Sequence, residues 1–141
     1  MPLDPKIAIY FNVITITKSL ECELFLREIL LKNTDKTARG KACFELGRDL
    51  CRSSDIVYSI VSGKVPIENY ERRWSKDFVK SLVDRGSDGL EKEGLKLLDR
   101  VITEFPDVDL NSGQPQPASP LAGHAMRYIE AHKRIAQLQN R

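Results

Sequence analysis

Apolar residues recur at every third or fourth position along most of this 141-residue chain, which is the spacing of one buried face of an α-helix. Beyond residue 17, no segment shows the sustained alternation of apolar and polar residues that a half-buried strand requires. The length is that of one ordinary domain. The sequence therefore predicts an all-α fold, with a helical domain at 1–110, a Pro-rich linker at 111–120 and an amphipathic helix at 121–141 packed on the same domain.

Helix start and stop signals divide the chain into about six to eight short helices. The expected segments are 19–31, 35–50, 53–62, 66–74, 75–86, 88–105 and 120–138. Asp88 and Glu91 have the spacing of a capping box, which predicts that the sixth of these helices begins at Asp88.

The segment at 7–17 is open to two interpretations. Its many β-branched residues favour a strand. Asp4 and Pro5 form a helix start, however, and apolar residues follow at helical spacing. A lone strand would also lack a partner, so we expect a helix here.

Leucine stripes and small residues predict how the helices pack. A wide apolar stripe on the segment 19–31, which we expect to be buried, consists of Leu20, Leu24, Ile29 or Leu30, and Leu31. The small residues Ala42, Cys43 and Gly47 indicate that their helix is closely approached by a neighbour, and Gly94, which interrupts another stripe, indicates a close helix crossing. The short turns between successive helices predict antiparallel hairpins, similar to the right-handed array of a tetratricopeptide repeat, although its full consensus is absent.

The formal charge of +2 gives no strong field toward nucleic acid or an anionic membrane. The residues from 119 to 141 alone carry +3, so the basic character lies in the last helix. Its side chains Arg127, Tyr128, Lys133 and Arg134 are therefore the candidate surface for a protein partner or for self-association.

Cys22, Cys43 and Cys51 form no C-x-x-C pair and have no matching histidine spacing, so the sequence predicts neither a zinc site nor a redox dithiol. Cys43 and Cys51 lie eight residues apart on one expected helix, about 12 Å, which is too far for a disulfide. We expect buried, reduced thiols.

No other pattern predicts a metal, a cofactor or a catalytic group. Asp107 and Asp109 resemble the start of a calcium loop, but the later ligand positions of such a loop do not match. His124 and His132 are about 12 Å apart along one helix, too far to share a metal ion. The sequence contains no P-loop, nucleophile elbow or dinucleotide fingerprint.

Tyr58, Tyr70 and Trp74 could form an aromatic platform for a ligand. They are spread over two short helices of the expected fold, 53–62 and 66–74, and aromatic residues so distributed usually pack in a core. We therefore expect them to be structural.

No signal peptide is visible, and the longest apolar run is far short of the ~20 residues that cross a bilayer, so we expect a cytoplasmic protein without a membrane span.

Three stretches, at 22–30, 38–46 and 95–108, resemble the helical region that precedes the thioredoxin-like domain in bacterial redoxin-type thiol-disulfide oxidoreductases. The resemblance extends over roughly residues 19–138 and includes no catalytic signature. It implies a helical accessory module, and export of the protein if this chain is part of a longer redoxin-type protein. The redox chemistry of the family belongs to a domain outside this chain.

Two functions follow from the sequence. The first is a non-catalytic helical module for protein interaction or spacing, because the amphipathic pattern comes without chemistry. The alternative is an accessory part of a thiol-disulfide oxidoreductase whose catalytic domain lies elsewhere.

Overall fold

The computed structural model describes residues 19–111, 115 and 117–141, and the helix expected at 7–17 lies outside them. The described residues form six helices and no strand, which confirms the all-α class. The helices are α2 (Leu20–Lys32), α3 (Lys36–Val61), α4 (Ile67–Arg73), α5 (Lys76–Arg85), α6 (Ser87–Glu104) and α7 (Leu121–Leu138). None of these helices is long and apolar enough to cross a membrane.

Side-chain caps explain why three helices begin where they do. The Ser19 hydroxyl accepts a hydrogen bond from the Cys22 amide at the start of α2, and the Ser75 hydroxyl does the same for Phe78 in α5. The Asp35 carboxylate accepts from the amide of Thr37 in α3. Each cap satisfies a backbone donor that the first turn leaves free.

The expected break at Ser53 is wrong, because α3 continues through it as one helix of 26 residues. Ser53 and Ser54 are fully buried, and the Ser54 hydroxyl lies 2.9 Å from the carbonyl oxygen of Ser87 in α6. These serines resemble a helix cap in the sequence, but at least one of them bonds a neighbouring helix instead.

The expected capping box at Asp88 is also wrong. Helix α6 starts at Ser87, after Gly86 in a left-handed conformation (φ 82°), and no side chain caps it. The Glu91 carboxylate accepts no hydrogen bond from a cap amide of this helix and lies 3.0 Å from His132 Nε2 of α7 instead.

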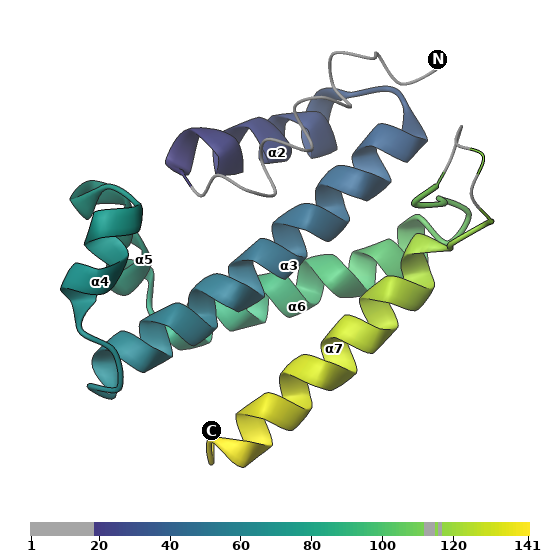
Figure 1. Cartoon of the computed structure of the whole chain (residues 1–141). Coiled ribbons are helices and arrows are strands. Elements are labelled where there is room, and N and C mark those ends of the chain that lie inside the picture. The colour runs from purple at the N-terminus through teal and green to yellow at the C-terminus, as the bar shows by residue number, and fades with distance from the viewer. Residues whose placement is uncertain (1–18, 112–114, 116) are drawn as a thin grey trace.

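Helices α3 and α6 pack antiparallel along their lengths and form the middle of the molecule, with α2 and α7 on opposite sides (Figure 1). A Cβ on Gly47 would lie 3.0 Å from the carbonyl oxygen of Gly94, which confirms the close crossing expected at these glycines. Gly40 is equally close to Val108 at one end of the pair, and Ser54 meets Ser87 at the other.

Backbone hydrogen bonds join the two ends of the segment before α7. The Leu110 amide donates to the Ser119 carbonyl at 2.8 Å, and the Leu121 amide donates to Val108 at 2.9 Å. Helix α7 then runs along α6 and α3, where the Tyr128 hydroxyl donates to the Arg48 carbonyl.

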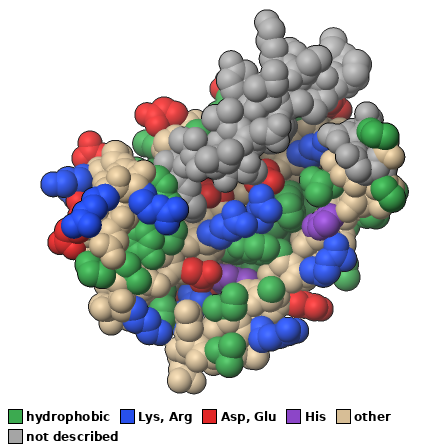
Figure 2. All heavy atoms as spheres, viewed as in Figure 1, with side chains coloured by type: hydrophobic (Ala, Val, Ile, Leu, Met, Phe, Trp, Pro, Cys, Tyr) green, Lys and Arg blue, Asp and Glu red, His purple; other side chains and the backbone are tan. Residues whose placement is uncertain are grey.

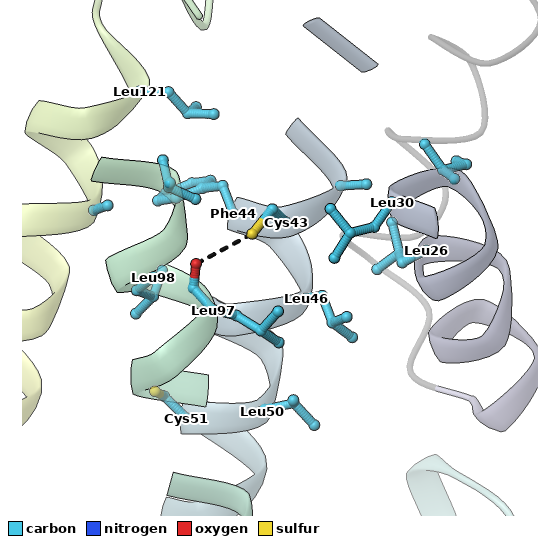
Figure 3. Close-up of a cluster of buried hydrophobic side chains, with 14 of the residues drawn as sticks. Leu26, Leu30, Cys43, Phe44, Leu46, Leu50, Cys51, Leu97, Leu98 and Leu121 are labelled. Carbon is cyan, nitrogen blue, oxygen red and sulfur yellow. Dashed lines mark hydrogen bonds between the residues drawn. The ribbon is translucent and has the colours of Figure 1, made fainter. Parts of the chain in front are cut away.

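The core contains side chains from α2, α3, α6 and α7, which Figure 3 shows converging. On α2 the buried apolar residues are Leu26, Ile29 and Leu30, so the expected burial of the stripe is confirmed at Ile29 and Leu30. The expectation that Leu20, Leu24 and Leu31 are buried is wrong, because they are 43%, 56% and 80% exposed. Helix α2 packs through the other side of its apolar stripe, so these three leucines face outward. The leucines that α3, α6 and α7 contribute to the core are Leu46, Leu50, Leu97, Leu98 and Leu121.

Candidate functional site

A groove of about 390 Å³ lies between α2, α3 and α6. It combines leucines with four cationic side chains and one carboxylate. Its lining consists of Arg27, Leu30, Leu31, Arg39, Leu46, Glu93, Lys96, Leu97 and Arg100. The formal charge of these residues is +3, whereas that of the whole chain is +2.

Each of the three helices contributes a leucine to the apolar part of the groove. Leu30 of α2, Leu46 of α3 and Leu97 of α6 are core residues that also line the groove. Leu31 lies at the edge and is 80% exposed. The groove is therefore an opening onto the hydrophobic core, with an exposed leucine beside it.

Leu31 continues into a row of leucines on the outside of α2. At 100° per residue, Leu20, Leu24 and Leu31 lie within about 40° of one another around the helix axis. All three are exposed, and Leu31 also lines the groove, so the row reaches the groove at Leu31. We call it the α2 leucine row below.

Four charged side chains clamp α2 to α5 and α6. Arg27 donates to both oxygens of Glu93, at 2.8 and 3.4 Å, and also pairs with Glu23 at 3.0 Å. Arg85 joins Glu23 at 2.8 Å and Glu93 at 3.2 Å. The hydrogen bond from Arg27 lowers the pKa of Glu93, although desolvation opposes the shift. This network fixes the wall of the groove at Arg27.

The other three cations of the groove are differently placed. Arg39 uses its Nε to donate to the Leu30 carbonyl at 3.0 Å, and its guanidinium lies over the Phe105 ring. Arg100 pairs with Glu104 at 3.0 Å on an exposed part of α6. Among the described residues, no ion pair is found for the exposed Lys96.

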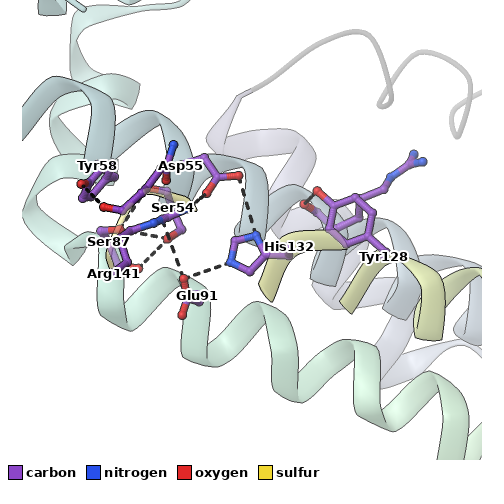
Figure 4. Close-up of polar contacts among 10 residues, drawn as sticks. Ser54, Asp55, Tyr58, Ser87, Glu91, Tyr128, His132 and Arg141 are labelled. Carbon is purple, nitrogen blue, oxygen red and sulfur yellow. Dashed lines mark hydrogen bonds and ion pairs between the residues drawn. The ribbon is translucent and has the colours of Figure 1, made fainter. Parts of the chain in front are cut away.

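A second polar cluster joins α3, α6 and α7 (Figure 4). His132 Nε2 lies 3.0 Å from Glu91, and Nδ1 lies 3.7 Å from Asp55. Arg141 pairs with Asp55 at 2.7 Å and stacks on the Tyr58 ring. Because His132 is only 3% exposed, a substrate cannot reach the imidazole, and the cluster serves to hold the three helices together.

Two of the three cysteines are sealed in the core. Cys43 and Cys51 are fully buried, and the Cys43 thiol donates to the Leu97 carbonyl (Figure 3). Desolvation raises the pKa of Cys43 to about 11 and that of Cys51 to about 12, so both stay protonated at neutral pH. Cys22 is only half-buried, so the expectation that all three thiols are buried is wrong for it.

The structure separates the four side chains of α7 that the sequence selected as a partner surface. Arg127, Lys133 and Arg134 are exposed. Tyr128 is half-buried, and its hydroxyl bonds α3. Arg127 also lies 3.2 Å from Nδ1 of His124.

The three aromatic residues considered as a platform do not form one. Tyr70 and Trp74 stack at 5.6 Å, and Trp74 meets Phe78 edge-on, which links α4 to α5. The Tyr58 hydroxyl instead donates to the carbonyl of Gln139 after α7.

The Asp107 and Asp109 carboxylates are used locally. Asp107 pairs with Lys36 at 3.2 Å, and Asp109 accepts from the amides of Asn111 and Ser119. Over the part of the chain that the structure describes, no group of three His, Cys, Asp or Glu side chains could hold a metal ion.

Acidic and basic side chains are interspersed over the face shown in Figure 2, with hydrophobic side chains between them. The excess of positive charge in the groove is therefore a local feature. Sequence reasoning missed the groove because its lining comes from positions up to 73 residues apart, Arg27 to Arg100. The one signal was a stripe on α2 too wide to be buried on a single side.

No protein-family model matches this sequence, and neither the search of curated proteins nor the search of solved structures gave a match.

Proposed function

We propose that this chain is a non-catalytic helical module that binds an amphipathic helix of a partner protein. The observation that carries the proposal is that Leu31, an end of the exposed α2 leucine row, also lines the groove. Helix-in-groove binding uses apolar anchors spaced three or four residues apart, which insert into an apolar groove.

The dimensions of this surface suit such a partner. From Leu20 to Leu31 the α2 leucine row extends over eleven residues, or about 16 Å, which equals about three helical turns. Single exposed leucines are common on protein surfaces, but a row that leads into a groove lined by core leucines is typical of an interaction site.

Three side chains that could act as a nucleophile or a base are enclosed, which supports a binding role. Cys43 and Cys51 are buried with raised pKa values, and His132 is enclosed by Glu91 and Asp55. A nucleophile needs access and a base poised within reach, and these groups lack the access. The tetratricopeptide-like packing and an accessory role beside a redoxin-type domain stay predictions.

The test is fluorescence anisotropy with a labelled peptide that forms an amphipathic helix of about four turns, with leucines on one face and glutamines elsewhere. We expect the full chain to bind it and Leu24→Gln/Leu31→Gln to weaken binding at least about fivefold, because two buried contacts are lost. Leu138→Gln is the matched control, since Leu138 of α7 is 81% exposed. Absence of binding, or equal loss with the control, would refute the proposed function.

A further inference from the structure

We propose that the helix bound in this groove is acidic, so that carboxylates along its flank meet Arg39, Lys96 and Arg100. The inference rests on the proposed function and adds the chemistry of the partner. It starts from the groove having a formal charge of +3 around a leucine floor.

The cations of the groove differ in how far they are already neutralised. Arg27 is engaged by Glu23 and Glu93 through hydrogen bonds that hold α2 in place. Arg39 has only its Nε committed to a neutral carbonyl, that of Leu30, so its charge is not neutralised by that bond. Lys96 is exposed and lies one turn from Arg100 on the same side of α6.

Arg39 of α3 and Arg100 of α6 line the groove from two different helices. Arg100 pairs with Glu104 at 3.0 Å, and the hydrogen bond from Arg100 and the charge of Arg39 both lower the pKa of Glu104. The positive charge on this part of the groove therefore comes from both helices. A carboxylate placed there would meet two cations.

Glu104 does not close this site. It is paired with Arg100, but the side chains are 48% and 33% exposed. An exposed pair of this kind contributes little to stability, so an incoming carboxylate can share or replace Glu104 at low cost.

Charge distinguishes an acidic helix from two other occupants of the groove, the N-terminal segment of this chain and a second copy of the chain. One of these is the segment 1–18 of this chain, whose charged side chains are Asp4, Lys6 and Lys18, so its formal charge of +1 would add to the positive charge of the groove. A second copy docking groove to groove would bring the same cations together. A carboxylate-bearing helix is the occupant that complements the groove.

The test compares three labelled peptides with the same leucine face and with Glu, Gln or Lys on the flanks, each titrated with the full chain. We expect the acidic peptide to bind about tenfold more tightly than the neutral one, because two or three exposed charge pairs form, and the basic one to bind most weakly. Raising the ionic strength from about 0.01 to 0.15 M should reduce this preference, since screening shortens the Debye length from about 30 to 8 Å.

A pair of variants with the same charge change locates the site. Lys96→Glu/Arg100→Gln should reduce the preference for the acidic peptide to about threefold or less, because one or no charge pair remains. Lys133→Glu/Arg134→Gln changes exposed residues of α7 in the same way and should leave the preference unchanged. Circular dichroism checks that both variants stay folded.

The outcomes distinguish this inference from the proposed function. Equal binding of the acidic and neutral peptides would overturn the inference and leave the function intact, whereas binding of none would overturn the function. Loss of the preference for the acidic peptide only in the α7 variant would place the acidic partner on α7 and refute the groove as its binding site. If the chain self-associates and this blocks the binding of all three peptides, a second copy of the chain is the occupant of the groove, which also refutes the inference.

Discussion

Gly94 of α6 lies so close to α3 that a Cβ on it would be 2.8 Å from the carbonyl oxygen of Gly47. The Sγ of Cys51 would be at the same distance. The backbones of α3 and α6 can approach this closely because neither glycine has a side chain. The groove depends on this crossing, since α3 and α6 supply two of its three walls.

Gly94→Ala should destabilise the protein by about 1–3 kcal/mol, the usual cost of overpacking, despite the better helix propensity of alanine. Gly89→Ala in the same helix is the control, because its added Cβ would meet nothing within 4 Å and should stabilise by about 0.5–1 kcal/mol. Urea unfolding measures both. Equal stabilisation by the two substitutions would show that the helices do not cross this closely.

Local signals predicted most helix boundaries, because a cap depends on residues only a few positions apart. Ser19 and Ser75 begin helices as expected. The predicted helix start at Ser53 was wrong, because a serine suited to a cap can also form a hydrogen bond to a neighbouring helix. The sequence does not reveal that Ser54 faces Ser87. Tertiary contacts override local propensity at such positions.

The candidate site could not be predicted in the same way. Its cations Arg39 and Arg100 lie 61 positions apart and line the same groove only because α3 and α6 pack against each other. The charge pattern of the sequence pointed to α7 instead, where Lys133 and Arg134 are close in sequence. Runs of charge along one helix are visible in a sequence, whereas a cluster from three helices requires their packing.

His132→Ala should lower stability by about 2–3 kcal/mol, because it opens a cavity and leaves Glu91 and Asp55 without the imidazole between them. Thermal unfolding compares this variant with Lys133→Ala. Because the Lys133 side chain is exposed, its removal should change the free energy of unfolding by less than about 0.5 kcal/mol. If the two variants melt alike, the cluster does not hold α7 in place.

Acid should weaken the clamp between α2 and α6. The hydrogen bond from Arg27 lowers the pKa of Glu93. The ionised Glu93 carboxylate therefore contributes fully to stability above the ordinary glutamate pKa, about 4.3, and this contribution is lost as the pH falls through the lowered pKa. Urea midpoints measured from about pH 6 to pH 3 should therefore fall less steeply in Glu93→Gln than in the unmodified chain. Glu28→Gln, which removes an exposed pair with Lys32, should keep the original slope.

Thiol labelling of the native protein near pH 8 should modify Cys22 and spare the other two cysteines. Cys22 is half-buried, whereas Cys43 and Cys51 are buried with raised pKa values and expose no thiolate. Cys22→Ala should abolish the fast phase seen with Ellman's reagent, and urea should release two slow thiols. Rapid native modification of Cys43 or Cys51 would contradict their burial and would restore thiol chemistry as a possible function.

Alkaline pH should destabilise the fold through the same two thiols. In the unfolded chain they ionise near pH 8.5, but in the folded protein Cys43 and Cys51 keep their protons until about 11 and 12. The folded state thus binds more protons between these values, so the free energy of unfolding falls as pH rises, by at most about 2 kcal/mol for each thiol at about pH 10. The test compares the free energy of unfolding of the unmodified chain with that of Cys43→Ala/Cys51→Ala at each pH, because tyrosine and lysine side chains also titrate in this range. The variant should start less stable, because it loses two buried sulfurs, and should lose less stability between about pH 8 and pH 10. Parallel pH profiles would mean that the two thiols ionise as easily in the folded protein as in the unfolded chain.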